Sequence, residues 1–330
     1  MEKFKVYRIH EFEKKVVARF EELALEDLDK GEVVVRVAYS SVNYKDALAA
    51  TGAGKIVRRF PCVGGIDLSG TVTESADPRF KRGDAILCTS YDLGVARDGG
   101  YAEYARIPAD WVVPMPKGMS LFEAMALGTA GYTAGLAVVR MEANGLAPAN
   151  GPVVVSGATG GVGSIAIDVL SRLGYHVVAL TGKEGEADYL KRLGAKEVMS
   201  RKGLDLGKIR ALGQATWAGA VDNLGGEVLA WMASTMMQGG TIASIGLAAS
   251  MNLNTTVAPF ILRGVSLLGI DSGSTPMPLR REIWGRLALD MRPAHLKDMT
   301  RTIPFDELPQ AFEGLLKGAA KGRIVVDMAA

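Results

Sequence analysis

The chain has 330 residues, of which 48% are hydrophobic and 22% are charged. This length exceeds the size at which one hydrophobic core stops growing, so we expect two domains. A net charge of +2 with scattered basic residues argues against a nucleic-acid-binding protein. Two cysteines, Cys62 and Cys88, exclude a disulfide framework and suit a reducing cytosol. We find neither a signal peptide nor an apolar run of about twenty residues, and we therefore expect a cytoplasmic protein that does not enter a membrane.

The first third of the chain has the pattern of a β-rich domain. Short runs of β-branched and aromatic residues alternate with turn signals such as Asp77-Pro78 and Arg82-Gly83-Asp84. Short strands joined by such turns favour a partly open barrel over a parallel sheet. The expected strands are 33–39, 69–73, 84–88 and 99–107.

The pattern then changes to alternating helices and strands. A helix is expected over 121–127, with Ser120 as its N-cap, and another over 130–140. The apolar run Val153-Val154-Val155-Ser156 is typical of a strand buried on both faces of a parallel sheet. The alternation that follows predicts βαβ units. We expect helices at 162–173, 187–193 and 281–291, and strands at 176–180, 197–199, 217–222, 240–245, 265–270 and 322–327.

A glycine cluster lies between the strand at Val153 and the next helix. A tight strand-to-helix turn needs residues without Cβ so that the backbone can approach a pyrophosphate. The helix N-terminus then offers unpaired N–H groups to the phosphates. Gly157, Gly160, Gly161 and Gly163 meet these needs, although their spacing departs by one residue from G-x-G-x-x-G. The cluster predicts a dinucleotide site, and the alternative is a turn that is merely tight.

The end of the following strand distinguishes the two nicotinamide cofactors. NAD enzymes place an acidic residue there for the ribose hydroxyls. Here the strand ends in Thr181-Gly182-Lys183, and a hydroxyl with a lysine favours the 2′-phosphate of NADPH. Glu184 argues the other way, and Lys183 is also readable as an ordinary loop lysine. Arg201 and Arg323 are further basic candidates for the phosphate.

The sequence offers no metal-ligand motif. A zinc site needs three or four clustered His, Cys or carboxylate ligands. The histidines, His10, His176 and His295, are far apart and have no ligand partner at motif spacing. We therefore expect no metal.

Two polar motifs of the first domain are candidates for chemistry. Ser40-Ser41-Val42-Asn43-Tyr44-Lys45-Asp46 follows a strand and begins a helix, and Gly64-Gly65-Ile66-Asp67 places a carboxylate in an apolar turn. A carboxylate there is costly unless it is hydrogen-bonded or functional. The alternative is that Asn43 and Asp67 only cap or brace turns.

Together these motifs resemble the medium-chain dehydrogenase/reductase superfamily on its zinc-free, quinone oxidoreductase side. Gly65-Ile66-Asp67 stands where the zinc enzymes have Gly-His-Glu. Four further segments are similar to the NADPH-dependent acrylyl-CoA reductase family, and the resemblance covers essentially the whole chain. These segments are Asn43 to Leu48, Asp77 to Phe80, Gly128 to Ala134 and Pro259 to Arg263.

The resemblance implies an α/β fold of two domains. Residues 1–128 and 273–330 would form a GroES-like catalytic domain with a partly open β-barrel, and 129–272 a Rossmann domain that binds NADPH. It also implies a homodimer whose Rossmann sheets meet edge to edge near Val265 to Ile270.

The resemblance further implies site residues. Asn43, Tyr44 and Asp67 would be catalytic, with Asn43 hydrogen bonding, Tyr44 contacting the cofactor and Asp67 fixing polar groups. The implied cofactor contacts are Thr159, Gly160, Gly161 and Val162 at the pyrophosphate, Thr181, Gly182, Lys183 and Arg201 at the adenosine phosphate, and Leu247, Ile261 and Ser272 on the other flank.

The implied reaction is reduction of acryloyl-CoA to propionyl-CoA, with hydride delivered to the β-carbon. Two alternatives stay open: a quinone or enone oxidoreductase, and a non-enzymatic NADPH-binding module. Lys55, Arg58 and Arg59 are candidates for contacting CoA phosphates, and they are equally readable as a solvated loop.

Overall fold

The structure, a computed structural model, describes residues 3–330 and divides them into two compact units. Unit 1 comprises the chain up to Thr129 with Gly273–Gly285 and Leu296–Ala330, and unit 2 comprises Ala130–Ser272 and Arg286–His295. The units differ from the predicted domains at two places, because Thr129 clusters with unit 1 and residues 286–295 cluster with unit 2. For residues 286–295 the reason is long-range pairing: Asp168 accepts the backbone N–H groups of Ala294 and His295.

Unit 1 is β-rich, as expected. One of its sheets has the order β2-β1-β4, and the other runs β15-β16-β3-β5-β6-β8, with β7 also paired to β3. The strands expected at 33–39 and 69–73 lie within β3 and β5, whereas β7 is shorter than expected because its predicted start, Gly99-Gly100, packs on the backbone of another turn. The bounds are β1 Phe4–Phe12, β2 Lys15–Leu23, β3 Val33–Ser41, β4 Cys62–Val63, β5 Asp67–Ser75, β6 Ala85–Thr89, β7 Tyr104–Ile107, β8 Val113–Pro114, β15 Thr300–Pro304 and β16 Arg323–Asp327.

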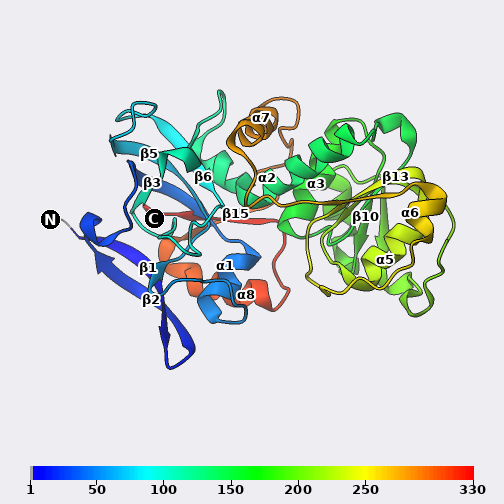
Figure 1. Cartoon of the computed structure of the whole chain (residues 1–330), viewed down its shortest axis with the longest axis horizontal. Coiled ribbons are helices and arrows are strands. Elements are labelled where there is room, and N and C mark those ends of the chain that lie inside the picture. Colours follow the sequence, from blue (N-terminus) through cyan, green and yellow to red (C-terminus); the bar gives the residue numbers. More distant parts are fainter. Residues whose placement is uncertain (1–2) are drawn as a thin grey trace. The chain divides into compact units, whose positions relative to one another are not determined.

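The helices of unit 1 complete its core. Helix α1 (Tyr44–Thr51) contacts α8 (Leu308–Leu316), and Figure 1 shows the two side by side. Buried Val35, Leu68 and Ile86 from the large sheet belong to the same apolar cluster as Phe312 of α8. Helix α7 spans Met277–Ala288, and its residues up to Gly285 belong to unit 1.

Helix α2 (Leu121–Ala143) is interrupted at Gly128, whose φ of 54° and ψ of −156° are not helical. The sequence predicts one helix before this position and one after it, as observed. Among residues 3–330, α2 is the helix long and apolar enough to cross a membrane, but 78% of its most apolar window is buried inside the protein. That burial is typical of a core helix, and it explains the apolar composition.

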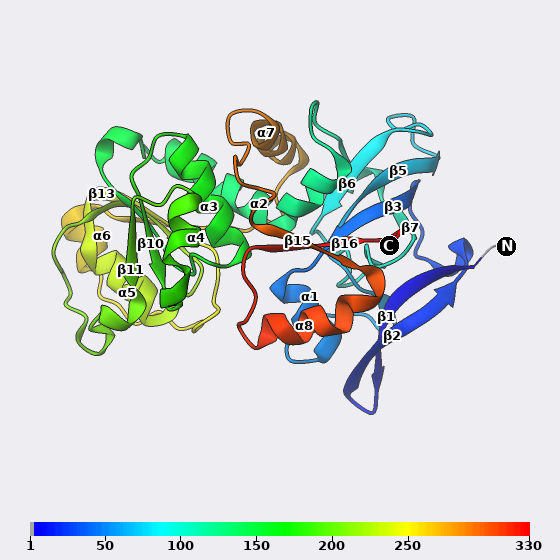
Figure 2. The ribbon, with the colours of Figure 1, turned by 180° about the vertical axis from the view of Figure 1, so that it is seen from behind.

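Unit 2 contains a parallel sheet with the strand order β11-β10-β9-β12-β13-β14. This is the doubly wound order of a Rossmann fold, so the predicted class is confirmed. Figure 2 shows α3 and α4 on one face of the sheet and α5 and α6 on the other. The bounds are β9 Val153–Val155, α3 Gly161–Arg172, β10 Val177–Thr181, α4 Ala187–Arg192, β11 Glu197–Ser200, β12 Trp217–Asp222, α5 Gly226–Thr235, β13 Met236–Ser244, α6 Ala258–Arg263 and β14 Ser266–Gly269.

The strand order reverses at β9, which pairs with β10 on one side and β12 on the other. Val155 is in register with Ala179 of β10 and Val221 of β12. Because the strands are parallel, their carboxyl ends meet at one edge of the sheet. In open α/β sheets, ligands bind outside this edge at such a reversal.

Candidate functional site

The glycine cluster forms a cradle at the N-terminus of α3. Gly157 has a φ of +57°, and a Cβ there would lie 3.1 Å from the Cβ of Asn223. A Cβ on Gly163 would lie 2.4 Å from the Gly157 carbonyl oxygen, so the turn closes only with glycine. Helix α3 begins at Gly161, with Gly160 as its N-cap, and its first N–H groups lack helical partners. The segment Thr159–Val162 therefore has the backbone geometry that binds a pyrophosphate.

The candidates for the adenosine phosphate come together at the ends of β10 and β11. Thr181 is in register with Ser200, the residue before Arg201. The Arg201 guanidinium lies over Gly182, since a Cβ on that glycine would meet Arg201 Nη2 at 3.4 Å. Lys183 follows directly, and its backbone N–H donates to Thr181 Oγ1 at 3.0 Å. The Arg201 guanidinium thus lies near the backbone of Thr181–Lys183, and the contact of these residues with a 2′-phosphate stays a prediction.

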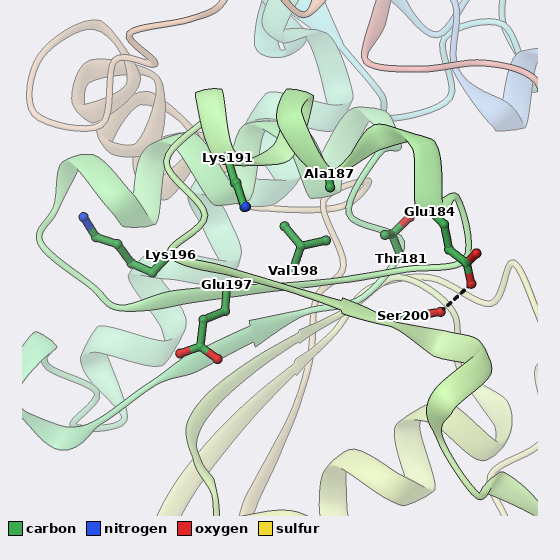
Figure 3. A pocket seen from close by; sticks show the side chains of 8 residues that line it. All are labelled: Thr181, Glu184, Ala187, Lys191, Lys196, Glu197, Val198 and Ser200. Atoms are coloured by element: carbon green, nitrogen blue, oxygen red, sulfur yellow. Dashed lines mark hydrogen bonds between the residues drawn. The ribbon is translucent and has the colours of Figure 1, made fainter.

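Glu184, the residue that argued for NAD, is directed elsewhere. Its carboxylate accepts a hydrogen bond from Ser200 Oγ at 3.0 Å and lies 3.6 Å from Lys202 Nζ. Figure 3 shows this carboxylate turned toward Ser200. One oxygen of the Glu184 carboxylate is therefore already hydrogen-bonded within the protein, which makes it less available to ribose hydroxyls.

A surface pocket of about 420 Å³ adjoins this corner, between α4 and β11 (Figure 3). Glu184 and Ser200 lie at one end and Lys196 and Glu197 at the other. The lining residues are Thr181, Glu184, Ala187, Lys191, Lys196, Glu197, Val198 and Ser200. The pocket thus extends from the carboxyl end of β10 along the edge strand β11.

In unit 1, Asp67 is the centre of a buried hydrogen-bond cluster. It is 0% exposed at the start of β5. Its Oδ2 accepts from Ser41 Oγ at 2.6 Å, Asn43 Nδ2 at 2.8 Å and the Thr129 backbone N–H at 2.8 Å. Its Oδ1 accepts from Thr129 Oγ1 at 2.5 Å. These donors offset the cost of burying a carboxylate, and Asp67 orders the polar groups around it.

Asn43 is held by charged groups on both sides. It is the N-cap of α1, and its side-chain amide donates to Asp46 at 3.1 Å as well as to Asp67. Its Oδ1 accepts from Arg323 Nη1 at 3.1 Å. Because both ends of the amide are engaged inside the protein, Asn43 positions its neighbours and is not a donor left over for a substrate.

Asp46 is a site residue that the sequence prediction missed. Its carboxylate accepts from the backbone N–H groups of Asn43 at 2.9 Å and Ile66 at 3.0 Å. Burial and the nearby Asp67 raise its pKa from 3.8 to about 7. In the sequence, Asp46 stands three positions after the N-cap Asn43, which is a capping pattern. That pattern does not predict that the carboxylate is buried.

Arg323 does not occupy the position expected for it. It is only 3% exposed, and besides Asn43 it donates to the carbonyl oxygens of Ala126 and Val42. Burial lowers the pKa of its guanidinium, while Asp67 and Asp46 act in the opposite direction. A binding role at the adenosine phosphate needs an exposed cation, so that expectation is corrected. Arg323 is instead the cation of the Asp67 cluster.

The remaining predicted residues are more exposed. Tyr44 begins α1 with 48% of its surface exposed, which makes it the accessible member of the predicted catalytic set. In unit 2, Leu247 and Ile261 are 62% and 72% exposed, and Ser272 accepts a hydrogen bond from Thr133 at 2.8 Å. Their cofactor contacts stay predictions. Over residues 3–330, no group of three or more His, Cys, Asp or Glu side chains is arranged to hold a metal ion.

Comparison with known proteins agrees with this architecture. Residues 29–117 match the family model described as the alcohol dehydrogenase GroES-like domain, and residues 161–288 match the one described as zinc-binding dehydrogenase. "Acrylyl-CoA reductase AcuI" of Ruegeria pomeroyi is 46% identical over 95% of each chain. The yhdH oxidoreductase of Salmonella enterica, solved in complex with NADP, has a TM-score of 0.95 at 42% identity and covers 98% of this chain and 99% of its own.

A third relative carries a different name. "Putative quinone oxidoreductase YhfP" of Bacillus subtilis is 50% identical over 93% of each chain. Its structure, solved with NAD bound, has a TM-score of 0.97 at 47% identity and covers 99% of this chain and 100% of its own. The resemblance read from the sequence motifs is confirmed. The chain belongs to the medium-chain dehydrogenase/reductase superfamily, on its zinc-free, quinone oxidoreductase side, and within it to the acrylyl-CoA reductase family.

Proposed function

We propose that the protein is an NADPH-dependent reductase of the C=C bond of short enoyl-CoA thioesters, with acryloyl-CoA as the favoured substrate. The observation that carries this proposal is the 46% identity to the Ruegeria acrylyl-CoA reductase over 95% of each chain. The intact Asn43, Tyr44 and Asp67 set supports it.

The residues of unit 2 fit a nicotinamide dinucleotide. The turn around Gly157 and Gly163 has no room for side chains, which leaves backbone N–H groups to meet a pyrophosphate. Lys183 and Arg201 would hold a 2′-phosphate, which favours NADPH over NADH. The NAD bound to YhfP makes NADH the alternative to test.

Besides cofactor binding, the reaction requires stabilisation of the charge on the thioester oxygen and a proton for the α-carbon. NADPH supplies the hydride that reaches the β-carbon of the substrate. Negative charge then develops on the thioester oxygen, and hydrogen-bond donors must stabilise it. Asp67 and Asn43 are buried and act through others: they fix the start of α1 and so place the exposed Tyr44. These two are positioning residues, and Tyr44 is the candidate for direct contact. A proton finally reaches the α-carbon, and water can supply it.

Two of the candidates for contacting CoA phosphates, Arg58 and Arg59, form ion pairs within unit 1. Arg59 donates to both carboxylate oxygens of Asp29 at 2.6 Å, and Arg58 pairs with Asp92. These ion pairs favour a structural role for both arginines. The quinone reductase alternative therefore stays open, and the 50% identity to YhfP favours it as the second candidate.

The test follows NADPH oxidation at its absorbance band with acryloyl-CoA, crotonoyl-CoA and a simple quinone in parallel. Preference for acryloyl-CoA supports the proposal. Faster turnover of the quinone would favour the second candidate, and NADPH binding without turnover of any acceptor would favour a non-enzymatic module.

A homodimer belongs to the same proposal. β14 is the last strand of the sheet of unit 2, and Leu267 on it is 37% exposed. An edge strand presents unpaired backbone groups that a second copy can pair with. Light scattering should give twice the mass of the chain, and a monomer mass would contradict this part. The cytoplasmic location stays a prediction.

A further inference from the structure

Asn223 has a buried acceptor atom that the protein leaves unused. It is the residue directly after β12, next to Ser156, which directly follows β9. Its side-chain Nδ2 donates to the Ser156 carbonyl oxygen at 2.7 Å, and its backbone N–H donates to Ser156 Oγ at 2.9 Å. Its Oδ1 is buried, and no group within residues 3–330 hydrogen-bonds to it. A buried polar atom without a partner is costly, so its persistence calls for a ligand or another explanation.

The orientation of this amide is fixed by its surroundings. Since Nδ2 must face the Ser156 carbonyl, the opposite atom is the oxygen. Asp222 accepts from Ser156 Oγ at 2.9 Å and from the Gly225 backbone N–H at 2.8 Å, which anchors the turn after β12. On the other side, a Cβ on Gly246 would lie 2.3 Å from the Asn223 carbonyl oxygen. The acceptor is therefore held in place before any ligand arrives.

Its position in the sheet indicates which part of a dinucleotide it meets. Asn223 borders the glycine cradle, because a Cβ on Gly157 would contact its Cβ at 3.1 Å. The adenosine-phosphate corner at Thr181–Lys183 follows β10, on the opposite side of β9. A dinucleotide crosses a Rossmann sheet at the reversal of strand order. With its pyrophosphate over the cradle and its adenosine on the β10 side, its other half lies on the β12 side.

We propose that Asn223 Oδ1 accepts a hydrogen bond from a ribose hydroxyl on the nicotinamide half of the cofactor. The inference rests on the proposed function, because it takes a nicotinamide dinucleotide as the ligand. An amide oxygen cannot pair with a phosphate oxygen, since both are acceptors, whereas a ribose hydroxyl can donate. Asn223 is then a binding residue for the half of the cofactor that reacts.

The test separates the two halves of the cofactor by calorimetric titration. The probes are NADPH and 2′,5′-ADP, which lacks the nicotinamide, its ribose and the phosphate attached to that ribose. Asn223→Ala keeps the Cβ beside Gly157 and should weaken NADPH about fivefold to thirtyfold, as loss of one hydrogen bond predicts. Binding of 2′,5′-ADP should stay within about twofold of wild type, which also shows that the cradle is folded. The matched control is Lys183→Ala, which should weaken both probes.

Three outcomes would overturn the inference. One is unchanged NADPH affinity in Asn223→Ala, and the second is an equal loss for NADPH and 2′,5′-ADP. The third is disappearance of the effect with the 3-acetylpyridine analogue of the cofactor, which keeps the ribose and lacks the carboxamide N–H. If Asn223→Ala does not fold, Asn223→Ser takes its place. Tight NADPH binding with no turnover of any acceptor contradicts the proposed activity and leaves this inference standing.

Discussion

Gly128→Ala tests whether the Asp67 cluster depends on a residue without a side chain. Gly128 has a φ of 54° and a ψ of −156°, a conformation that is open essentially only to glycine. A Cβ there would lie 2.6 Å from Arg323 Nη2, 2.6 Å from Asp67 Oδ2 and 2.9 Å from Ser41 Oγ. An alanine must therefore both strain the backbone and push the buried charged groups apart.

The two effects have separate magnitudes. Backbone strain of this kind costs about 1–3 kcal/mol. Weakened charge-assisted hydrogen bonds at Asp67 add about 1–3 kcal/mol. We therefore expect Gly128→Ala to lower the free energy of unfolding by about 2–6 kcal/mol. Turnover should fall as well, while NADPH affinity should change little, because the glycine cradle belongs to unit 2.

The matched control is Gly118→Ala, in the same unit. Gly118 has a φ of +82°, and nothing lies within 4 Å of a Cβ placed on it, so this variant carries backbone strain alone. Urea unfolding of both variants, followed by circular dichroism, measures the difference. If Gly128→Ala loses no more stability than Gly118→Ala, the close packing of the cluster around this glycine is refuted.

Three further predictions concern charges. Lys183→Ala should weaken NADPH by about 1–3 kcal/mol and NADH far less, and equal losses in titrations of the two cofactors would contradict the 2′-phosphate assignment. Asp67→Asn should lower turnover while the Kd for NADPH stays unchanged, and an unchanged rate would favour the alternative that Asp67 only braces a turn. The pKa of Asp46 is raised from 3.8 to about 7, so the folded state binds an extra proton between these values and stability should fall as the pH rises from about 4 to 7. Urea unfolding across that range should show a shallower fall for Asp46→Asn, and parallel curves would contradict it.

Much of unit 2 could be predicted because its signals are local. The run Val153–Val155 is buried on both faces, and the glycine turn and helix follow at once, so the sequence records the cradle in a dozen consecutive residues. Helix α5 was missed because Gly226–Thr235 opens with a glycine and is apolar nearly all round, which hides the helical period. In unit 1, the hairpin of β1 and β2 was not among the expected strands, because charged residues are dense along both strands.

The Asp67 cluster could be predicted only in part, because its members come from distant segments. Arg323 donates to Asn43 from 280 residues away, a separation that leaves no pattern in the sequence. Its charge suggested a phosphate ligand, and only the fold shows that it faces buried carboxylates instead. The same holds for Thr129, whose hydroxyl and backbone N–H both serve Asp67 from 62 residues away.

The cluster explains what the Gly65-Ile66-Asp67 sequence does in place of the Gly-His-Glu motif of the zinc enzymes. Oδ2 of Asp67 accepts three hydrogen bonds, from Ser41, Asn43 and Thr129, so its lone pairs serve the protein. Asparagine at this position can keep those three donors only by turning its NH₂ toward Thr129 Oγ1. That hydroxyl would then accept instead of donate, which leaves its proton free for the 2.9 Å hydrogen bond with Ser90 Oγ. Asp67→Asn therefore preserves the shape of the cluster while removing its charge, so a loss of turnover in that variant would identify the buried charge as the property that the reaction uses.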